Sequence, residues 1–104
     1  MDYIIFESRL LRLVDKYITS TVGKLIKIKS SHQLGDEKDF DLVDENGNMI
    51  FQYSGSLGVS KHLFASISDL FSMNQSETEN LFQRWFEQKY PDLPIRAVYY
   101  SIYF

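Results

Sequence analysis

The strongest constraint on the fold is a pair of short apolar runs separated by an Asn-Gly turn sequence. Residues 40–43 (Phe-Asp-Leu-Val) and 49–53 (Met-Ile-Phe-Gln-Tyr) flank the polar segment 44–48 (Asp-Glu-Asn-Gly-Asn). Asn and Gly both tolerate the positive backbone φ angles of tight hairpin turns, so this pattern predicts a β-hairpin. The chain therefore contains an antiparallel pair of strands within residues 40–53.

Two further segments have the composition of strands. Residues 24–29 predict a half-buried strand, with Ile26 and Ile28 on one side and Lys27 and Lys29 on the other. Residues 95–104 are rich in β-branched and aromatic side chains and predict a final strand. The polar segment 30–39 and the glycine-containing segment 54–58 are predicted to be loops.

Residues 3–20 have the periodicity of a helix with a broad apolar face. Apolar residues recur at spacings of three and four, which places them in two neighbouring stripes. So wide a face indicates burial against more than one neighbour. Gly23 follows the helix and can adopt the left-handed conformation in which helices commonly end. The first stripe is Tyr3, Phe6, Leu10, Leu13 and Tyr17, and the second is Ile4, Leu11, Val14 and Ile18.

Two more helices are expected before the final strand. The first covers residues 61–72, with Ser60 as its N-cap residue. The second begins at residues 76–79 (Ser-Glu-Thr-Glu), which match a capping box, and ends near Tyr90 because Pro91 follows. The apolar stripe of this last helix consists of Leu81, Phe82, Trp85, Phe86 and Tyr90.

These elements occur in the order α-β-β-β-α-α-β. Antiparallel strands followed by helices favour an α+β fold. We expect three helices to pack on a small antiparallel sheet made of the hairpin 40–53 and strands near 24–29 and 95–104. A length of 104 residues fits a single domain, residues 1–104, that is large enough to build a core without disulfides.

The residue types of catalytic and metal sites are scarce. The chain has no Cys, which excludes a disulfide, a thiol nucleophile and a zinc–thiolate site. Its two His residues, His32 and His62, belong to no recognisable triad. Segment 44–47 matches the EF-hand signature only around its Gly, and segment 55–61 lacks the spacing of a P-loop. We therefore expect no catalytic residue, no metal site, no cofactor and no enzyme activity.

Charge is divided along the chain, although the formal net charge is only −3. Between residues 8 and 35 six basic side chains accompany one acid, Asp15, whereas residues 36–45 are mostly acidic. The acidic balance disfavours nucleic acid as the partner. The basic region 9–29 and the helix pair 61–90 nevertheless leave a nucleic-acid-binding regulator as the alternative function. The six basic residues are Arg9, Arg12, Lys16, Lys24, Lys27 and Lys29.

The final strand ends in an unusual aromatic run. Alternation places Tyr99 and Tyr103 on one face of the strand, and Tyr100 and Phe104 on the other. Tyr is enriched in protein interfaces because it joins an apolar body to a polar tip, while burial in the core and nucleobase stacking are the alternatives. We expect an aromatic surface here and charge complementarity from the acidic hairpin. The expected partner-binding residues are Tyr99, Tyr100, Tyr103, Phe104, Asp36, Glu37, Asp39, Asp41, Asp44 and Glu45.

Part of the chain resembles a group of viral proteins. The resemblance is carried by Leu57-Gly58-Val59-Ser60, Leu70-Phe71-Ser72-Met73, Glu79 and Trp85-Phe86-Glu87-Gln88-Lys89-Tyr90. In this order the segments resemble small uncharacterised proteins encoded by bacteriophages and other viruses, over about residues 49–98. The resemblance implies a viral origin and brings no activity with it. Small phage proteins commonly act by binding other proteins.

These observations predict a phage-encoded, non-enzymatic interaction protein. It would bind a host or virion protein, either as an inhibitor of a host factor or as a virion component. Its expected location is the host cytoplasm or the virion, because no segment has the pattern of a membrane helix or a signal peptide. The sequence leaves open whether the chain also forms a homo-oligomer.

Overall fold

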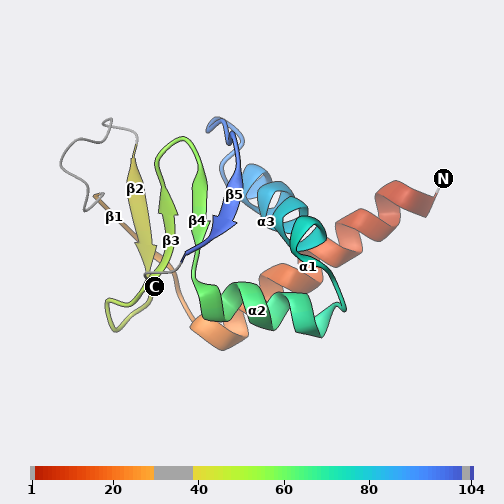
Figure 1. Ribbon diagram of the computed structural model, residues 1–104, viewed down its shortest axis with the longest axis horizontal. Helices are drawn as coiled ribbons and strands as arrows, with labels where there is room; N and C mark the ends of the chain where they lie inside the picture. Colours follow the sequence, from red (N-terminus) through yellow and green to blue (C-terminus); the bar gives the residue numbers. More distant parts are fainter. Residues whose placement is uncertain (1, 30–38, 102–103) are drawn as a thin grey trace.

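The computed structural model describes residues 2–29, 39–101 and 104, with the backbone alone for residues 2–8. Within these residues it has three helices and a five-stranded sheet (Figure 1). The α+β class predicted from the sequence is confirmed, with one strand more than expected. The elements are α1 (Asp2–Val22), β1 (Ile26–Lys29), β2 (Phe40–Val43), β3 (Met49–Tyr53), β4 (Leu57–Val59), α2 (Lys61–Leu70), α3 (Gln75–Lys89) and β5 (Val98–Tyr100).

The strands lie side by side in the order in which they occur in the sequence. β1 to β4 form three antiparallel pairs, whereas β5 runs parallel to β4. The fully antiparallel sheet expected from the sequence is therefore a mixed sheet. A parallel pair needs a long crossover connection, and α2 and α3 provide that connection between β4 and β5.

β4 begins within the segment 54–58 that was predicted to be a loop. Gly55 makes the turn before it with a φ of +81°, but Leu57 and Gly58 are paired with β3. The loop prediction is therefore wrong at these two residues. Gly58 does not form a turn but leaves room for a side chain. A Cβ atom at Gly58 would lie only 2.9 Å from the hydroxyl oxygen of Tyr99 on β5, so the strand accommodates glycine at this position.

The predicted hairpin of β2 and β3 is confirmed, but its turn is longer than a two-residue Asn-Gly turn. Within segment 44–48 only Gly47 has a positive φ, +85°. Its amide donates a hydrogen bond to the carbonyl of Asp44 at 3.0 Å. The pairing shifts register between Leu42 and Val43. The turn therefore differs from a two-residue Asn-Gly turn, in which both central residues would have positive φ angles.

The core lies between the sheet and the helices. At its centre Phe51 of β3 stacks on Trp85 of α3, with ring centroids 5.1 Å apart. A second aromatic group joins Phe40 and Tyr53 of the hairpin to Phe86 of α3, at centroid distances of 6.2 and 5.6 Å. The apolar stripe predicted for the third helix therefore faces the sheet.

The two stripes predicted on α1 have different environments. Leu11, Val14 and Ile18 of the second stripe are buried in the core. Leu13 of the first stripe is 54% exposed, so the expectation that the whole broad face is buried is wrong at this residue. Figure 1 shows the first turns of α1 extending past the other elements, which limits what the helix can pack against. The side chains of Tyr3, Ile4 and Phe6 lie outside the described residues.

β1 has the predicted alternation but not the predicted burial, because all four of its residues are exposed. The register places Lys27 beside Leu42 and Ile28 beside Asp41. Leu42 faces the core, so the lysines of β1 lie on the helix side of the sheet and the isoleucines on the opposite side. The prediction of a half-buried strand is wrong, because the isoleucines lie on the face opposite to the helices and remain exposed.

The helix starts show which polar residues act as caps. Asn74 and Glu77 form the capping box of α3, with reciprocal hydrogen bonds of 2.8 and 3.0 Å. The prediction that Ser76 begins this helix is wrong, because Asn74 and Glu77 form an equivalent box two residues earlier. Ser60 is the N-cap residue of α2 as predicted, although its side chain makes no capping hydrogen bond. Gly23, with a φ of +83°, ends α1 as predicted.

Replacing Asn74 with Ala removes the acceptor for the amide of Glu77. We expect the free energy of unfolding to fall by about 1 kcal/mol, the usual effect of losing a helix cap. Ser76→Ala and Ser60→Ala should each change it by less than about 0.5 kcal/mol, because neither hydroxyl caps a helix. Urea unfolding measures all three values. A larger loss in Ser76→Ala than in Asn74→Ala would contradict the observed capping box.

Candidate partner-binding site

The aromatic strand predicted to bind a partner is β5, at one edge of the sheet. Within the described part of the chain it pairs only with β4, so no strand covers its other edge (Figure 1). Val98 is buried and anchors the strand in the core. Tyr99 and Tyr100 point to opposite faces and are 41% and 44% exposed. The structure therefore leaves two of the four predicted aromatic residues accessible on one edge strand.

Both exposed tyrosines are held by contacts within the fold. The ring of Tyr99 lies over Gly58, where its atoms come within about 3 Å of the position of a Cβ. The ring of Tyr100 packs against Phe64 of α2, with centroids 5.4 Å apart. A side chain already held in one orientation loses less conformational entropy when it binds. Tyr99 and Tyr100 are thus exposed and preorganised at the same time.

Arg96 extends the same edge but is not among the residues predicted from the sequence. It is exposed, and its amide donates a hydrogen bond to the carbonyl of Gly55 at 2.9 Å. Its guanidinium lies against Gly55, since a Cβ there would be 2.8 Å from Nη2 of Arg96. Tyr and Arg are over-represented among the residues that dominate binding energies. Arg96, Tyr99 and Tyr100 together form what we call the β5 surface.

The acidic residues of the hairpin do not form one continuous surface. Asp41 is fully buried in β2, Asp39 is half-buried, and Glu45 is exposed at the turn. Asp44 faces its own turn, where its carboxylate accepts two backbone amides at 2.9 Å and the side-chain amide of Asn48 at 3.0 Å. The hydrogen bond from the backbone of Asn48, followed by that from its side chain, holds the pKa of Asp44 below its usual value. Asp41 is therefore inaccessible to a partner, and Asp44 stabilises its own turn.

Phe104 has a structural contact away from the β5 surface. Its carbonyl accepts a hydrogen bond from the amide of Lys61 at 2.9 Å, at the start of α2. Phe104 thus supplies an acceptor for the first amide of α2, a group that an N-cap side chain does not normally reach. Of the remaining predicted partner-binding residues, Asp36, Glu37 and Tyr103 lie outside the described residues.

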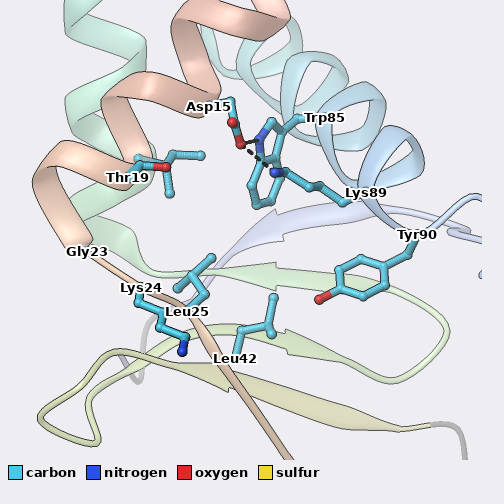
Figure 2. Close-up of a pocket in the computed structure, with 10 residues that line it drawn as sticks. Asp15, Thr19, Gly23, Lys24, Leu25, Leu42, Trp85, Lys89 and Tyr90 are labelled. Atoms are coloured by element: carbon cyan, nitrogen blue, oxygen red, sulfur yellow. Dashed lines mark hydrogen bonds and ion pairs between the residues drawn. The ribbon is translucent and has the colours of Figure 1, made fainter.

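A cleft of about 420 Å³ lies between α1, α3 and the start of β1. Ile18, Leu42 and Trp85, all buried, form part of its lining. Figure 2 shows Asp15 and Lys89 pointing toward one another on one side of the cleft. The hydroxyl of Tyr90 points into the cleft from the end of α3 (Figure 2). The cleft combines an apolar lining with ionisable groups, which is the usual composition of a binding pocket.

Asp15 connects two helices at this cleft. Its Oδ1 atom accepts a hydrogen bond from Nε1 of Trp85 at 3.1 Å and lies 2.8 Å from Nζ of Lys89. The hydrogen bond from Lys89, more than that from Trp85, lowers the pKa of Asp15. Burial raises the pKa of the neighbouring Tyr90 hydroxyl. The only acid of the basic region is therefore already paired with a cation of α3.

The ammonium group of Lys27 belongs to the same neighbourhood. Its Nζ lies 4.4 Å from the ring centroid of Phe40 and 5.8 Å from that of Tyr90. Such cation–π contacts hold the charge near the sheet while the side chain stays exposed. The sequence did not reveal this cleft, because its walls come from α1, β2 and α3, which are far apart along the chain.

Comparison of the chain with protein-family models, with curated proteins and with solved structures gave no match. In the residues that the structure describes, no group of three or more His, Asp or Glu could hold a metal ion. None of the helices described is both long and apolar enough to span a bilayer.

The pKa of Asp15 makes a pH-dependent contribution to stability testable. A lowered folded-state pKa stabilises the fold above the unfolded-state pKa, and this stabilisation is lost as pH falls through the folded-state value. Asp15→Asn should therefore lower the free energy of unfolding at pH 7, by less than about 1 kcal/mol because the ion pair is partly exposed.

The difference between wild type and Asp15→Asn should shrink as the pH is lowered to about 3, as measured by urea unfolding. Asp69→Asn, at an exposed position of α2, is the matched control for removing a carboxylate. A difference for Asp15→Asn that stays constant across this range would contradict the ion pair.

Proposed function

We propose that this chain is a non-enzymatic protein-binding module that engages its partner through the β5 surface. The observation that carries the proposal is the position of Tyr99 and Tyr100, both about four-tenths exposed on opposite faces of one edge strand. A partner that adds a strand to β5 would gain main-chain hydrogen bonds along the edge. It would also contact one fixed tyrosine on each face of the extended sheet.

The residue types of the β5 surface fit this role. A few Tyr, Trp and Arg side chains commonly supply most of the binding energy of an interface. The hairpin acids have a smaller part than in the sequence-based hypothesis, since Asp41 is buried and Asp44 binds its own turn. Glu45 remains exposed at the turn and can add charge complementarity.

The setting of the partner follows from the resemblance to viral proteins. That resemblance supports a phage-encoded chain acting in the host cytoplasm or in the virion. The partner would then be a host factor that the chain inhibits, or another protein of the virion.

Site-specific photo-crosslinking tests the β5 surface directly. We place benzoylphenylalanine at position 100 and, as the matched control, at Leu70, which is 53% exposed on α2. We expect position 100, and not position 70, to crosslink to one partner in cells that contain it. The double variant Tyr99→Ala, Tyr100→Ala should compete at least about tenfold less well than wild type for this crosslink. Equal crosslinking from positions 70 and 100 would contradict the proposal. So would a double variant that competes as well as wild type.

A nucleic-acid-binding regulator is the second candidate, and one observation favours it. The six basic residues between positions 9 and 29 are all exposed, while Asp15 among them is paired with Lys89. The helix pair α2–α3 is less suitable, because α3 exposes the carboxylates of Glu77 and Glu87 to any approaching phosphate.

Filter binding of labelled nucleic acid at low salt separates the two candidates. The protein-binding proposal predicts no saturable retention. Retention that falls steeply with salt, and is lost in Arg12→Glu, Lys16→Glu, would favour the nucleic-acid candidate.

A further inference from the structure

The edge of the sheet opposite to β5 is formed by β1. In the part of the chain that the structure describes, β1 pairs only with β2, and its outer edge carries no strand. Ile26 and Ile28 are 39% and 43% exposed on the face opposite to the helices. An edge strand of this kind offers unpaired backbone groups to an incoming extended chain.

The same edge leads directly into the cleft. Lys24 and Leu25 precede β1 and line the cavity of about 420 Å³, together with Leu42 and Trp85. Figure 2 shows the side chain of Leu25 turned toward the cavity and the amino group of Lys24 turned away from it. A chain lying along β1 would therefore pass beside an apolar hollow large enough for a side chain.

The charge of this edge is strongly positive. Lys24, Lys27 and Lys29 are all exposed within six residues, and no acid lies between them in the sequence. The one carboxylate on the cleft rim, Asp15, is already engaged by Lys89 at 2.8 Å. Acidic side chains on an incoming strand would thus find three available cations along a short path.

The edge strands of a second copy do not suit this edge. Residues directly opposite each other in an antiparallel pair share a face, so two β1 strands related by a two-fold axis would place lysine opposite lysine. Such like-charged pairs are destabilising. β5 of a second copy would bring Arg96 and no acid to the same lysines. The charge pattern therefore disfavours pairing of β1 with β1 or β5 of a second copy.

We propose that β1 and the adjoining cleft bind an extended acidic segment of a protein partner. The segment adds a strand to β1, sets its carboxylates beside Lys27 and Lys29 on the helix side and ends near Lys24, and inserts one apolar side chain from the same face into the cleft. Main-chain hydrogen bonds supply general affinity, the lysines select acidic sequences, and the cleft sets the register. This surface is separate from the β5 surface and does not depend on it.

Titration of the ¹⁵N-labelled full chain with a blocked peptide of alternating Glu and Val, in which Leu replaces the central Glu so that it shares a face with the carboxylates, tests the proposal. We expect saturable shifts of the backbone amides of residues 24–29 and of the indole N–H of Trp85. A twin peptide with Gln at every Glu position should bind at least about tenfold more weakly, because it keeps the shape and loses the charge.

Charge-reversing variants identify the residues responsible. Lys24→Glu with Lys29→Glu should weaken binding of the acidic peptide at least about tenfold. This pair leaves Lys27 and its ring contacts in place, which protects the fold. Arg9→Glu with Lys61→Glu makes the same change in net charge at exposed positions elsewhere and should bind nearly as well as wild type. Dispersed amide spectra of both variants verify that they are folded.

The proposal would be overturned by any of the following results. These are the absence of saturable shifts, equal binding of the Gln peptide, equal weakening in the Arg9 and Lys61 control, and a Trp85 indole that does not respond. Shifts confined to residues 96–100 would also overturn it while leaving the β5 surface intact, so the two surfaces are tested independently.

Discussion

The contact between Trp85 and Phe51 joins the two layers of the fold. One face of the indole stacks on the central strand β3, while its N–H donates a hydrogen bond to Asp15 on α1. A single side chain thus connects the sheet, α3 and α1. The same indole lines the cleft, and Asp15 forms an ion pair with Lys89 at its rim. The core and the cleft beside the basic edge therefore share one residue, Trp85.

Local patterns predicted most of the secondary structure. The Asn-Gly hairpin and the three helices were recognisable because turn residues and apolar periodicity act within a few positions. The capping box of α3 was misplaced because two pairs of residues match the capping-box pattern. These pairs are Asn74 with Glu77 and Ser76 with Glu79. β4 and the parallel pairing of β5 were missed because Gly58 acquires its role only when Tyr99, distant in sequence, lies over it.

The candidate surfaces were predictable to different degrees. The exposure of Tyr99 and Tyr100 follows from an aromatic strand whose two faces are both large, which a small sheet cannot cover completely. The positions of Asp41 and Asp44 were not predictable, because counting acids ignores burial and the hydrogen bonds of a turn. Arg96 and the cleft depend on contacts between distant segments, and no short sequence pattern reports such contacts.

The parallel pairing of β4 and β5 also affects how the molecule is assembled. The other strand pairs close over shorter stretches of chain, and local contacts generally form earlier in folding. α2 and α3 separate β5 from β4 in the sequence. Among the strand pairs of the sheet, β4 and β5 therefore have the largest entropy cost of loop closure. Tyr99 and Tyr100 therefore reach their positions in the sheet only when this long-range pairing has formed. A partner that recognises them would distinguish a chain in which β4 and β5 are paired from one in which they are not.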